Sequence, residues 1–146
     1  MYEKVNEAHF RLPDEVDNIV TQLKPEILEL NKEKQLFEGD DNEGKEIGKY
    51  KPLTEQLSEG ITGKGYPKRA GDSFNMYASG NLFDSIDLIF KNNVIDFFTK
   101  TPNHPFLEKN PTKAKTLFGL TKENQEITNY SLVMPKLVKW YKTMLR

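Results

Sequence analysis

The chain has 146 residues, the length of one domain, and we expect a single domain over residues 1–146. It contains no cysteine, which excludes disulfide bonds, thiolate metal sites and a cysteine nucleophile. The net charge is -1, and no segment approaches the roughly 20 apolar residues of a membrane-spanning helix, so we expect no membrane partner.

The first residues precede any regular apolar pattern, and we expect an N-terminal arm over residues 1–12, which also lacks the apolar run of a secretory signal. Pro13 and Asp14 are typical of a helix start. The apolar residues that follow recur at helical spacing; they are Val16, Ile19, Val20, Leu23, Ile27 and Leu30. Pro25 lies off this stripe, so the sequence predicts either one amphipathic helix kinked at Pro25 or two abutting helices, with the stop at Gly39.

The segment 39–72 is rich in glycine, lysine, glutamate and proline, with few apolar residues, and we expect a long extended loop there. Loops of this length in a small domain are commonly functional or ordered by a partner. Lys64, Lys68 and Arg69 form a basic patch beside Tyr66 near the end of this loop. We interpret these four residues as a candidate site of protein interaction.

Apolar and polar residues alternate along residues 73–78 and again along 86–90, which is typical of β-strands. A Ser-Gly-Asn turn at 79–81 separates these two segments. The pair Asn92-Asn93 precedes a third apolar segment at 94–99, and asparagine tolerates the left-handed conformation of a two-residue hairpin turn. The sequence therefore predicts a small antiparallel meander.

Prolines at positions 102, 105 and 111 predict an irregular segment before the last helix, which Thr121 can cap. The apolar face of this helix consists of Ile127, Tyr130, Met134, Leu137, Val138, Tyr141 and Leu145. The basic residues Lys136, Lys139, Lys142 and Arg146 cluster nearly opposite. We interpret Lys136, Lys139 and Lys142 as a second candidate surface for protein interaction.

The order of these elements predicts an α+β fold: a small antiparallel sheet packed by an N-terminal and a C-terminal amphipathic helix, with a long extended loop. Charge is distributed unevenly, since residues 26–46 hold eight acids and three lysines, whereas residues 127–146 hold four basic residues and no acid. Subunits with oppositely charged ends can associate head to tail. Two solvated helix faces of opposite sign explain the same pattern.

Patterns that indicate chemistry are weak in this sequence. His9 and His104 have no cysteine, histidine or carboxylate at metal-ligand spacing. The glycines around Lys64 resemble a phosphate-binding turn, but Tyr66 stands where a P-loop requires lysine. We therefore expect no catalytic site, cofactor or metal and classify the chain as a non-enzyme. Paired carboxylates among Asp72, Asp84, Asp87 and Asp96 leave a hydrolase open as the weakest alternative.

The basic patches raise the question of nucleic acid, because lysine and arginine neutralise phosphates. The net charge is slightly negative, and the aromatic residues do not alternate with the basic ones as a stacking platform requires. We expect no specific nucleic-acid partner.

Three short segments resemble one group of proteins. The first runs from Leu30 through the Gly39 turn into Tyr50-Lys51-Pro52-Leu53. Members of the group similarly run from a first helix into a Gly/Asp turn and then a "Tyr/Trp-x-Pro-Leu" stretch. The second is YASGNLFDSI at 77–86, in which a glycine reverses the chain, and the third is the aromatic-glycine step at 117–121. Together these segments resemble the small tail-completion and virion-morphogenesis proteins that act near the head–tail junction of tailed phages.

The resemblance covers about a third of the chain and implies a structural subunit at the neck or tail terminus of the virion. Its implied partners are other virion proteins, namely connector, portal-proximal or tail proteins, and further copies of itself in a ring of sixfold or higher symmetry. Its implied location is the virion, and the host cytoplasm during assembly. The proline-rich segment 102–111 and the long last helix depart from the group's pattern. The alternative is a small module that binds a host protein through the cationic last helix.

Overall fold

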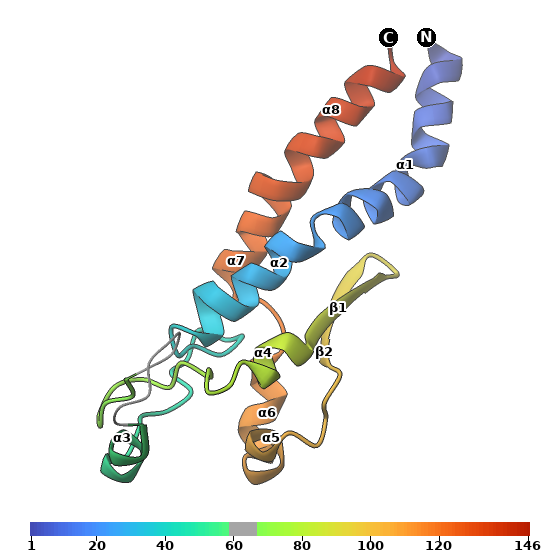
Figure 1. Cartoon of the computed structure of the whole chain (residues 1–146). Coiled ribbons are helices and arrows are strands. Elements are labelled where there is room, and N and C mark those ends of the chain that lie inside the picture. The colour runs from blue at the N-terminus through green and yellow to red at the C-terminus, as the bar shows by residue number, and fades with distance from the viewer. Residues whose placement is uncertain (59–66) are drawn as a thin grey trace.

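The computed structural model describes residues 1–58 and 67–146. Two helical arms and a β-hairpin lie above a base of short helices and loops (Figure 1). The α+β fold predicted from the sequence is confirmed, with a helix at each end of the chain and one antiparallel sheet. The helices cover one face of this sheet, as the amphipathic patterns predicted.

The first helix, α1 (Tyr2–Gln22), begins at the start of the chain, so the helix start predicted at Pro13 is wrong and the segment predicted as an N-terminal arm, residues 1–12, is helical from Tyr2. Pro13 lies inside α1 instead of at its start. Proline lacks the N–H that would bond to the preceding turn, and it bends a helix that continues through it. Figure 1 shows the corresponding change of direction within α1.

Of the two alternatives at Pro25, the structure has two abutting helices. α1 ends at Gln22, and α2 (Lys24–Asn31) follows after Leu23, with Pro25 in its first turn. Proline is well tolerated there because the first N–H groups of a helix have no partner within the helix. α2 continues into a π-helical turn, η1 (Lys32–Leu36), and the helical path ends before Gly39, whose φ is 97°.

The segment 39–72 is more structured than the predicted extended loop. It contains the helix α3 (Pro52–Ser58), which begins at a proline. It also forms two isolated β-bridges: Asp40 pairs with Glu46 within the segment, and Lys49 pairs with Ser73 just after it. Residues 59–66 lie outside the described residues.

The sheet is a single hairpin of β1 (Ile86–Lys91) and β2 (Val94–Thr99). The strand predicted at residues 73–78, ahead of these two, is wrong. A short helix, α4 (Asn81–Ser85), leads directly into β1. The predicted turn is confirmed, because Asn92 and Asn93 have φ values of 53° and 60°. Residues 73–78 form only the bridge at Ser73, and Met76 breaks the extended path with a φ of 52°.

The proline-rich segment is helical, which corrects the prediction of an irregular stretch. α5 (Pro105–Lys109) and α6 (Pro111–Leu117) each begin at a proline. The fixed φ of proline suits the first helical position, where its missing N–H costs nothing. These prolines therefore start two helices.

The last helical arm consists of α7 (Lys122–Glu126), a π-helical segment η2 (Ile127–Val133) and α8 (Met134–Met144). The predicted cap is confirmed, since the Thr121 hydroxyl accepts a hydrogen bond from the Asn124 N–H at 3.2 Å. The π-helical segment lies just before Pro135, whose ring clashes with the carbonyl of the preceding turn in a regular α-helix.

The buried apolar residues form two adjoining clusters. The lower cluster consists of Leu36, Ile47, Leu82, Phe83, Ile86, Leu107 and Leu117. The upper cluster consists of Ile19, Val20, Leu23, Ile27, Leu88 and Leu120. The predicted stripe of the first helix supplies most of the upper cluster, which lies between α1, α2, the hairpin and the last helical arm.

A group of buried or half-buried amides, here named the clasp, joins α2, η1 and the turn after them to the segment that leads into α7. Its members are Asn31, Gln35, Asn42 and Asn124. The Asn31 amide nitrogen donates to the carbonyl oxygens of Leu117 at 3.2 Å and Gly119 at 2.7 Å. The Asn42 amide nitrogen donates to Phe118 O at 3.0 Å. The clasp thereby fixes the point at which the last helical arm leaves the body.

Asp87 on β1 ties the sheet to two lysines. Its carboxylate oxygens lie 2.6 Å from Lys24 Nζ and 2.8 Å from Lys100 Nζ. Only 13% of the Asp87 side chain is exposed, so water screens these contacts less than those of a surface pair. The hydrogen bonds from Lys100 and Lys24 hold the pKa of Asp87 well below its usual range.

The replacement Asp87→Asn should lower the free energy of unfolding at neutral pH by about 2 kcal/mol, because two charge-assisted hydrogen bonds to partly exposed lysines are lost. A carboxylate whose pKa is depressed by folding stabilises the native state above its unfolded pKa of roughly 4, and that contribution disappears as the pH falls further. The difference between wild type and variant should therefore vanish in acid. Urea unfolding of both proteins at a series of acidic pH values measures this difference in the free energy of unfolding.

Asp96 provides the matched control, since it lies exposed on β2 and makes no ion pair among the described residues. We expect Asp96→Asn to leave the free energy of unfolding nearly unchanged. A loss equal to that of Asp87→Asn would contradict the role assigned to the lysine contacts.

Candidate functional site

The structure describes two of the four residues of the predicted loop site, Lys68 and Arg69. Lys64 and Tyr66 lie outside the described residues. Lys68 is only 7% exposed, which contradicts its assignment to a mobile basic patch. Arg69 is exposed, and its part in protein interaction stays a prediction.

Lys68 instead makes hydrogen bonds to residues on either side of it in the chain. Its ammonium group donates to the Tyr50 hydroxyl at 2.9 Å, to Asn75 Oδ1 at 3.0 Å and to the Tyr77 carbonyl oxygen. The same group lies 4.7 Å from the centre of the Tyr50 ring. Burial lowers the pKa of Lys68. The sequence could not predict this, because the acceptors come from three separate positions along the chain.

An aromatic cavity of 270 Å³ adjoins Lys68, and its lining includes Tyr50, Phe74, Tyr77 and Phe106. His104 also lines it and caps α5, since its Nδ1 accepts a hydrogen bond from the Phe106 N–H at 3.2 Å. His104 is therefore half-buried, not an exposed loop residue. The sequence did not predict this cavity, because its aromatic residues are spread between positions 50 and 106 without a common spacing.

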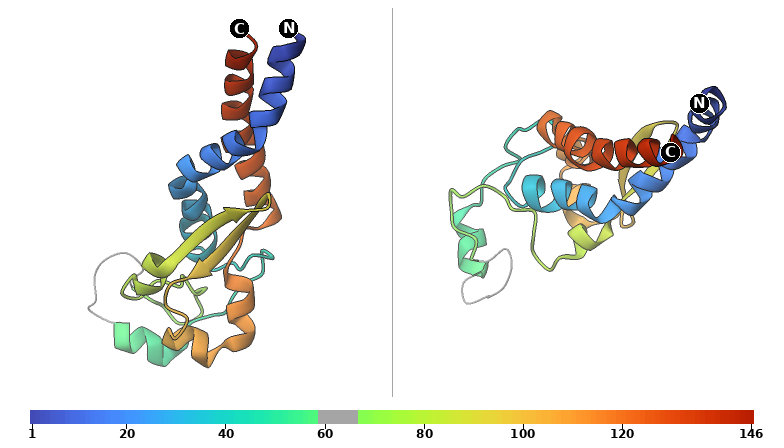
Figure 2. Two further views of the ribbon diagram at one scale, coloured as in Figure 1. Left: turned by 90° about the vertical axis from the view of Figure 1, so that its right-hand side faces the viewer. Right: turned by 90° about the horizontal axis from the view of Figure 1, so that it is seen from above.

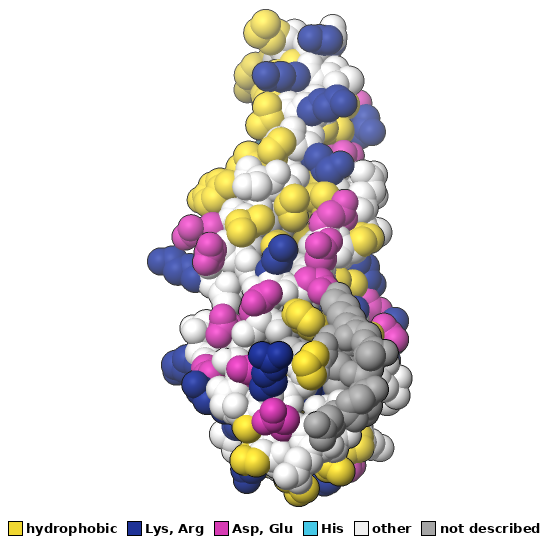
Figure 3. Space-filling model, turned by 60° about the vertical axis from the view of Figure 1, so that its left-hand side comes forward, with side chains coloured by type: hydrophobic (Ala, Val, Ile, Leu, Met, Phe, Trp, Pro, Cys, Tyr) yellow, Lys and Arg dark blue, Asp and Glu magenta, His cyan; other side chains and the backbone are white. Residues whose placement is uncertain are grey.

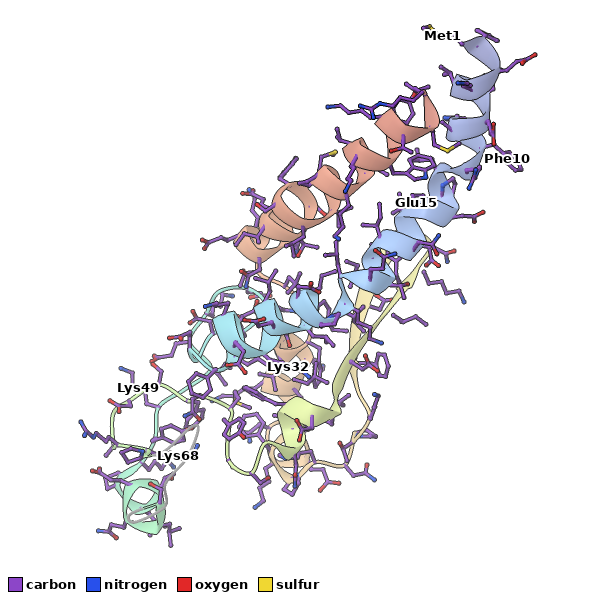
Figure 4. All side chains as sticks on the ribbon, turned by 45° about the horizontal axis from the view of Figure 1, so that its top comes forward. Met1, Phe10, Glu15, Lys32, Lys49 and Lys68 are labelled. Carbon is purple, nitrogen blue, oxygen red and sulfur yellow. The ribbon has the colours of Figure 1, made fainter. Side chains whose placement is uncertain are left out.

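The second predicted surface, on the last helix, is exposed as expected. Lys136, Lys139 and Lys142 are all exposed, and none makes an ion pair with any residue in 1–58 or 67–146. Lys136 and Lys139 line a groove of 260 Å³ between α8 and α1, in which Glu15 lies on the α1 side. Figure 4 shows the position of Glu15 on α1 beside α8.

The two chain ends form a protruding pair of helices, here named the stem: residues 2–12 of α1 and all of α8. Its helices run antiparallel and carry both termini side by side at one end of the molecule (Figures 1 and 2). Trp140 and Met144 are half-buried on α8, and Arg11 Nη1 lies 3.8 Å from Met144 Sδ across the pair. Figure 2 shows that the outer part of the stem rises clear of the rest of the fold.

The last helical arm packs on the upper cluster with only part of its apolar face. Leu132, Val133 and Leu137 pack against the upper cluster. A second row remains exposed, with Met134 at 44%, Val138 at 43%, Tyr141 at 38% and Leu145 at 39%. These four residues, here named the α8 ridge, follow the spacing of four, three and four residues that is typical of a helix-packing seam.

α1 presents a different outer face. Tyr2 is 82% and Phe10 86% exposed, and Figure 4 places Phe10 on the side of α1 turned away from α8. At 100° per residue, the acids Glu3 and Glu7 lie beside these two aromatic rings. Tyr2, Phe10, Glu3 and Glu7 are here named the α1 face.

Figure 3 shows hydrophobic side chains along one edge of the protruding end and lysine or arginine side chains along the other. Large exposed apolar residues grouped in this way mark a surface for other proteins more often than scattered ones do. The stem is therefore the best candidate for a functional surface in the described part of the chain.

Within residues 1–58 and 67–146 there is no group of three or more histidine, aspartate or glutamate side chains that could hold a metal ion. No helix in the same ranges is long and apolar enough to cross a membrane. Asp87, one of the carboxylates considered for hydrolysis, is held by two lysines in a structural ion pair.

Comparisons with protein-family models, with curated proteins and with solved structures found no match to this chain.

Proposed function

We propose that this chain is a structural subunit of a tailed-phage virion at the neck or tail terminus, held by protein–protein contacts in a ring. The observation that carries the proposal is the stem, where both helices expose large apolar side chains that no part of the described fold covers. Phage origin rests on the resemblance of the three short motifs. Its partners are further copies of the chain and the connector, portal-proximal or tail proteins next to it.

The motif residues support the proposal because they lie at turning points of the fold. Gly80, in the segment at 77–86, has a φ of 88° and starts α4, which delivers the chain into the hairpin. Gly119 has a φ of 126° and supplies a carbonyl oxygen to the clasp. These two glycines therefore lie where the chain turns, as the glycines of the motifs are expected to do.

Quantitative mass spectrometry of purified particles from the producing host, scaled to the portal protein, tests the proposal. We expect a fixed copy number that is a multiple of six, since the implied ring has sixfold or higher cyclic symmetry. Absence from particles would reject the virion role.

The second candidate function is binding of a host protein through the cationic face of α8. The observation that favours it is that Lys136, Lys139 and Lys142 are exposed and make no ion pair among the described residues. In the particle experiment, a chain that is absent from virions but abundant in infected cytosol supports this function. Reversing the three charges should then abolish capture of the host protein.

A further inference from the structure

The two outer surfaces of the stem are chemically complementary. From Met134 to Arg146 the chain carries four basic residues and no acid. The α1 part of the stem carries Glu3 and Glu7 against Lys4 and Arg11, with Glu7 3.6 Å from Arg11, and Asp14 and Asp17 follow next to it along α1. A helix with an exposed apolar row and a cationic flank therefore lies next to one with exposed aromatic rings and an acidic flank.

The α8 ridge has the geometry of a surface that packs on another helix. Met134, Val138, Tyr141 and Leu145 alternate by four and three residues, which keeps them on one side of the helix over its whole length. In the stem this side does not face α1, because Leu137, Trp140 and Met144 are the half-buried residues of α8. The ridge therefore has the pattern of a packing seam without a packing partner in the described chain.

The charges beside the α8 ridge favour α1 of a neighbouring copy over a second α8 as its partner. Lys142 and Arg146 directly follow Tyr141 and Leu145 of the ridge, so two α8 helices packed on each other would bring these like charges near one another, which opposes association. The α1 face offers Tyr2 and Phe10 for the apolar row and Glu3 and Glu7 for the lysines. Opposite charges flanking an apolar seam specify both partner and orientation.

We propose that the α8 ridge of one copy packs on the α1 face of a neighbouring copy, so that the stems join head to tail. This proposal rests on the proposed ring and names the contact that builds it. Each copy uses two different surfaces, and a contact of this kind continues from copy to copy until the rotation closes a ring. The partner is therefore a second copy of this chain.

Two blocked variants test the contact. Tyr2→Asp with Phe10→Asp blocks the α1 face, and Val138→Asp with Leu145→Asp blocks the α8 ridge. All four side chains are at least 37% exposed, so the variants should fold like the wild type, as circular dichroism will show. Size-exclusion chromatography with light scattering should find the wild type as an oligomer and each variant alone as a monomer.

Mixing the two variants distinguishes a head-to-tail contact from a symmetric one. The α1-blocked copy retains its α8 ridge, and the α8-blocked copy retains its α1 face, so one contact forms and no further growth is possible. We expect a one-to-one complex with twice the mass of a single chain. A control with Leu53→Asp and Leu57→Asp on α3, which are 65% and 72% exposed, should assemble like the wild type.

Three results would overturn the proposal: a wild-type chain that stays monomeric up to its solubility limit, blocked variants that assemble like the wild type, or a mixture that forms no complex. The outcome is separable from the proposed function. If particles contain the chain while blocked variants still assemble, the virion role stands and this contact fails. If the mixture behaves as expected but particles lack the chain, the contact stands and the virion role fails.

Discussion

Replacing Gly39 by alanine should lower the free energy of unfolding by about 3 kcal/mol, since it combines an unfavourable backbone conformation with a steric clash. Gly39 has a φ of 97°, which L-residues with a side chain rarely adopt. A Cβ at this position would lie 2.7 Å from the Phe74 carbonyl oxygen and 2.8 Å from Ser73 Cβ. Urea unfolding monitored by circular dichroism measures the loss.

The segment opposite Gly39 cannot easily move aside. The Phe74 N–H donates to the Gly48 carbonyl oxygen at 2.7 Å, and Ser73 forms a β-bridge with Lys49. Gly71→Ala is the matched control, because Gly71 has a similar φ of 89° but no atom within 4 Å of an added Cβ. It should cost about 1 kcal/mol, the conformational part alone. Equal losses for the two variants would contradict the close approach at Gly39.

Replacing Gln35 by methionine should also cost about 3 kcal/mol, because it leaves buried polar groups of the clasp without partners. Gln35 is 1% exposed, and its Nε2 donates to the Gly119 carbonyl oxygen at 3.0 Å. Its Oε1 accepts from the Thr121 N–H at 2.9 Å and from Asn124 Nδ2 at 3.3 Å. Methionine has nearly the same length, so the change removes hydrogen bonds with little change of volume.

Gln125→Met is the control for the clasp. Gln125 is exposed, and its Nε2 donates to one carbonyl oxygen, that of Leu120, at 2.8 Å. Water can replace this hydrogen bond, so we expect a loss of less than about 1 kcal/mol in urea unfolding. A Gln35→Met variant as stable as Gln125→Met would show that the clasp does not hold the last helical arm.

The clasp matters for the proposed assembly because it sets where the last helical arm leaves the body. Gln35 and Asn124 join η1 to α7, and α7 continues through η2 into α8. A loosened clasp should therefore let the α8 part of the stem change its direction relative to the sheet. The surfaces that meet a neighbouring copy depend on that direction.

Part of the clasp was visible in the sequence. Asn31 and Gln35 follow Ile27 at intervals of four residues, so they continue the buried side of the first helices with amides in place of apolar side chains. A buried amide needs a partner, so two amides in this register would be compatible with a hydrogen-bonded junction, which was not predicted. Its acceptors at residues 117–121 lie more than 80 residues away, and no local pattern connects the two segments.

Two predictions failed for different physical reasons. Residues 73–78 alternate like a strand, but a strand forms only when a neighbour offers its backbone, and here the neighbouring backbone at Gly48 and Lys49 provides a single bridge. Prolines 105 and 111 were interpreted as helix breakers, although at the first position of a helix proline favours it.

The sequence by itself determined the features that depend on near neighbours: the helical stripe from Val16 to Ile27, the Asn92-Asn93 turn, the Thr121 cap and the exposed lysines of the last helix. Spacing, turn conformation and capping act within a few residues, so they can be inferred from local sequence. Only the tertiary structure decided that Lys68 is buried and that the α8 ridge is uncovered. Burial depends on what the rest of the chain brings to a surface, and the outer part of the stem extends past the sheet and both core clusters.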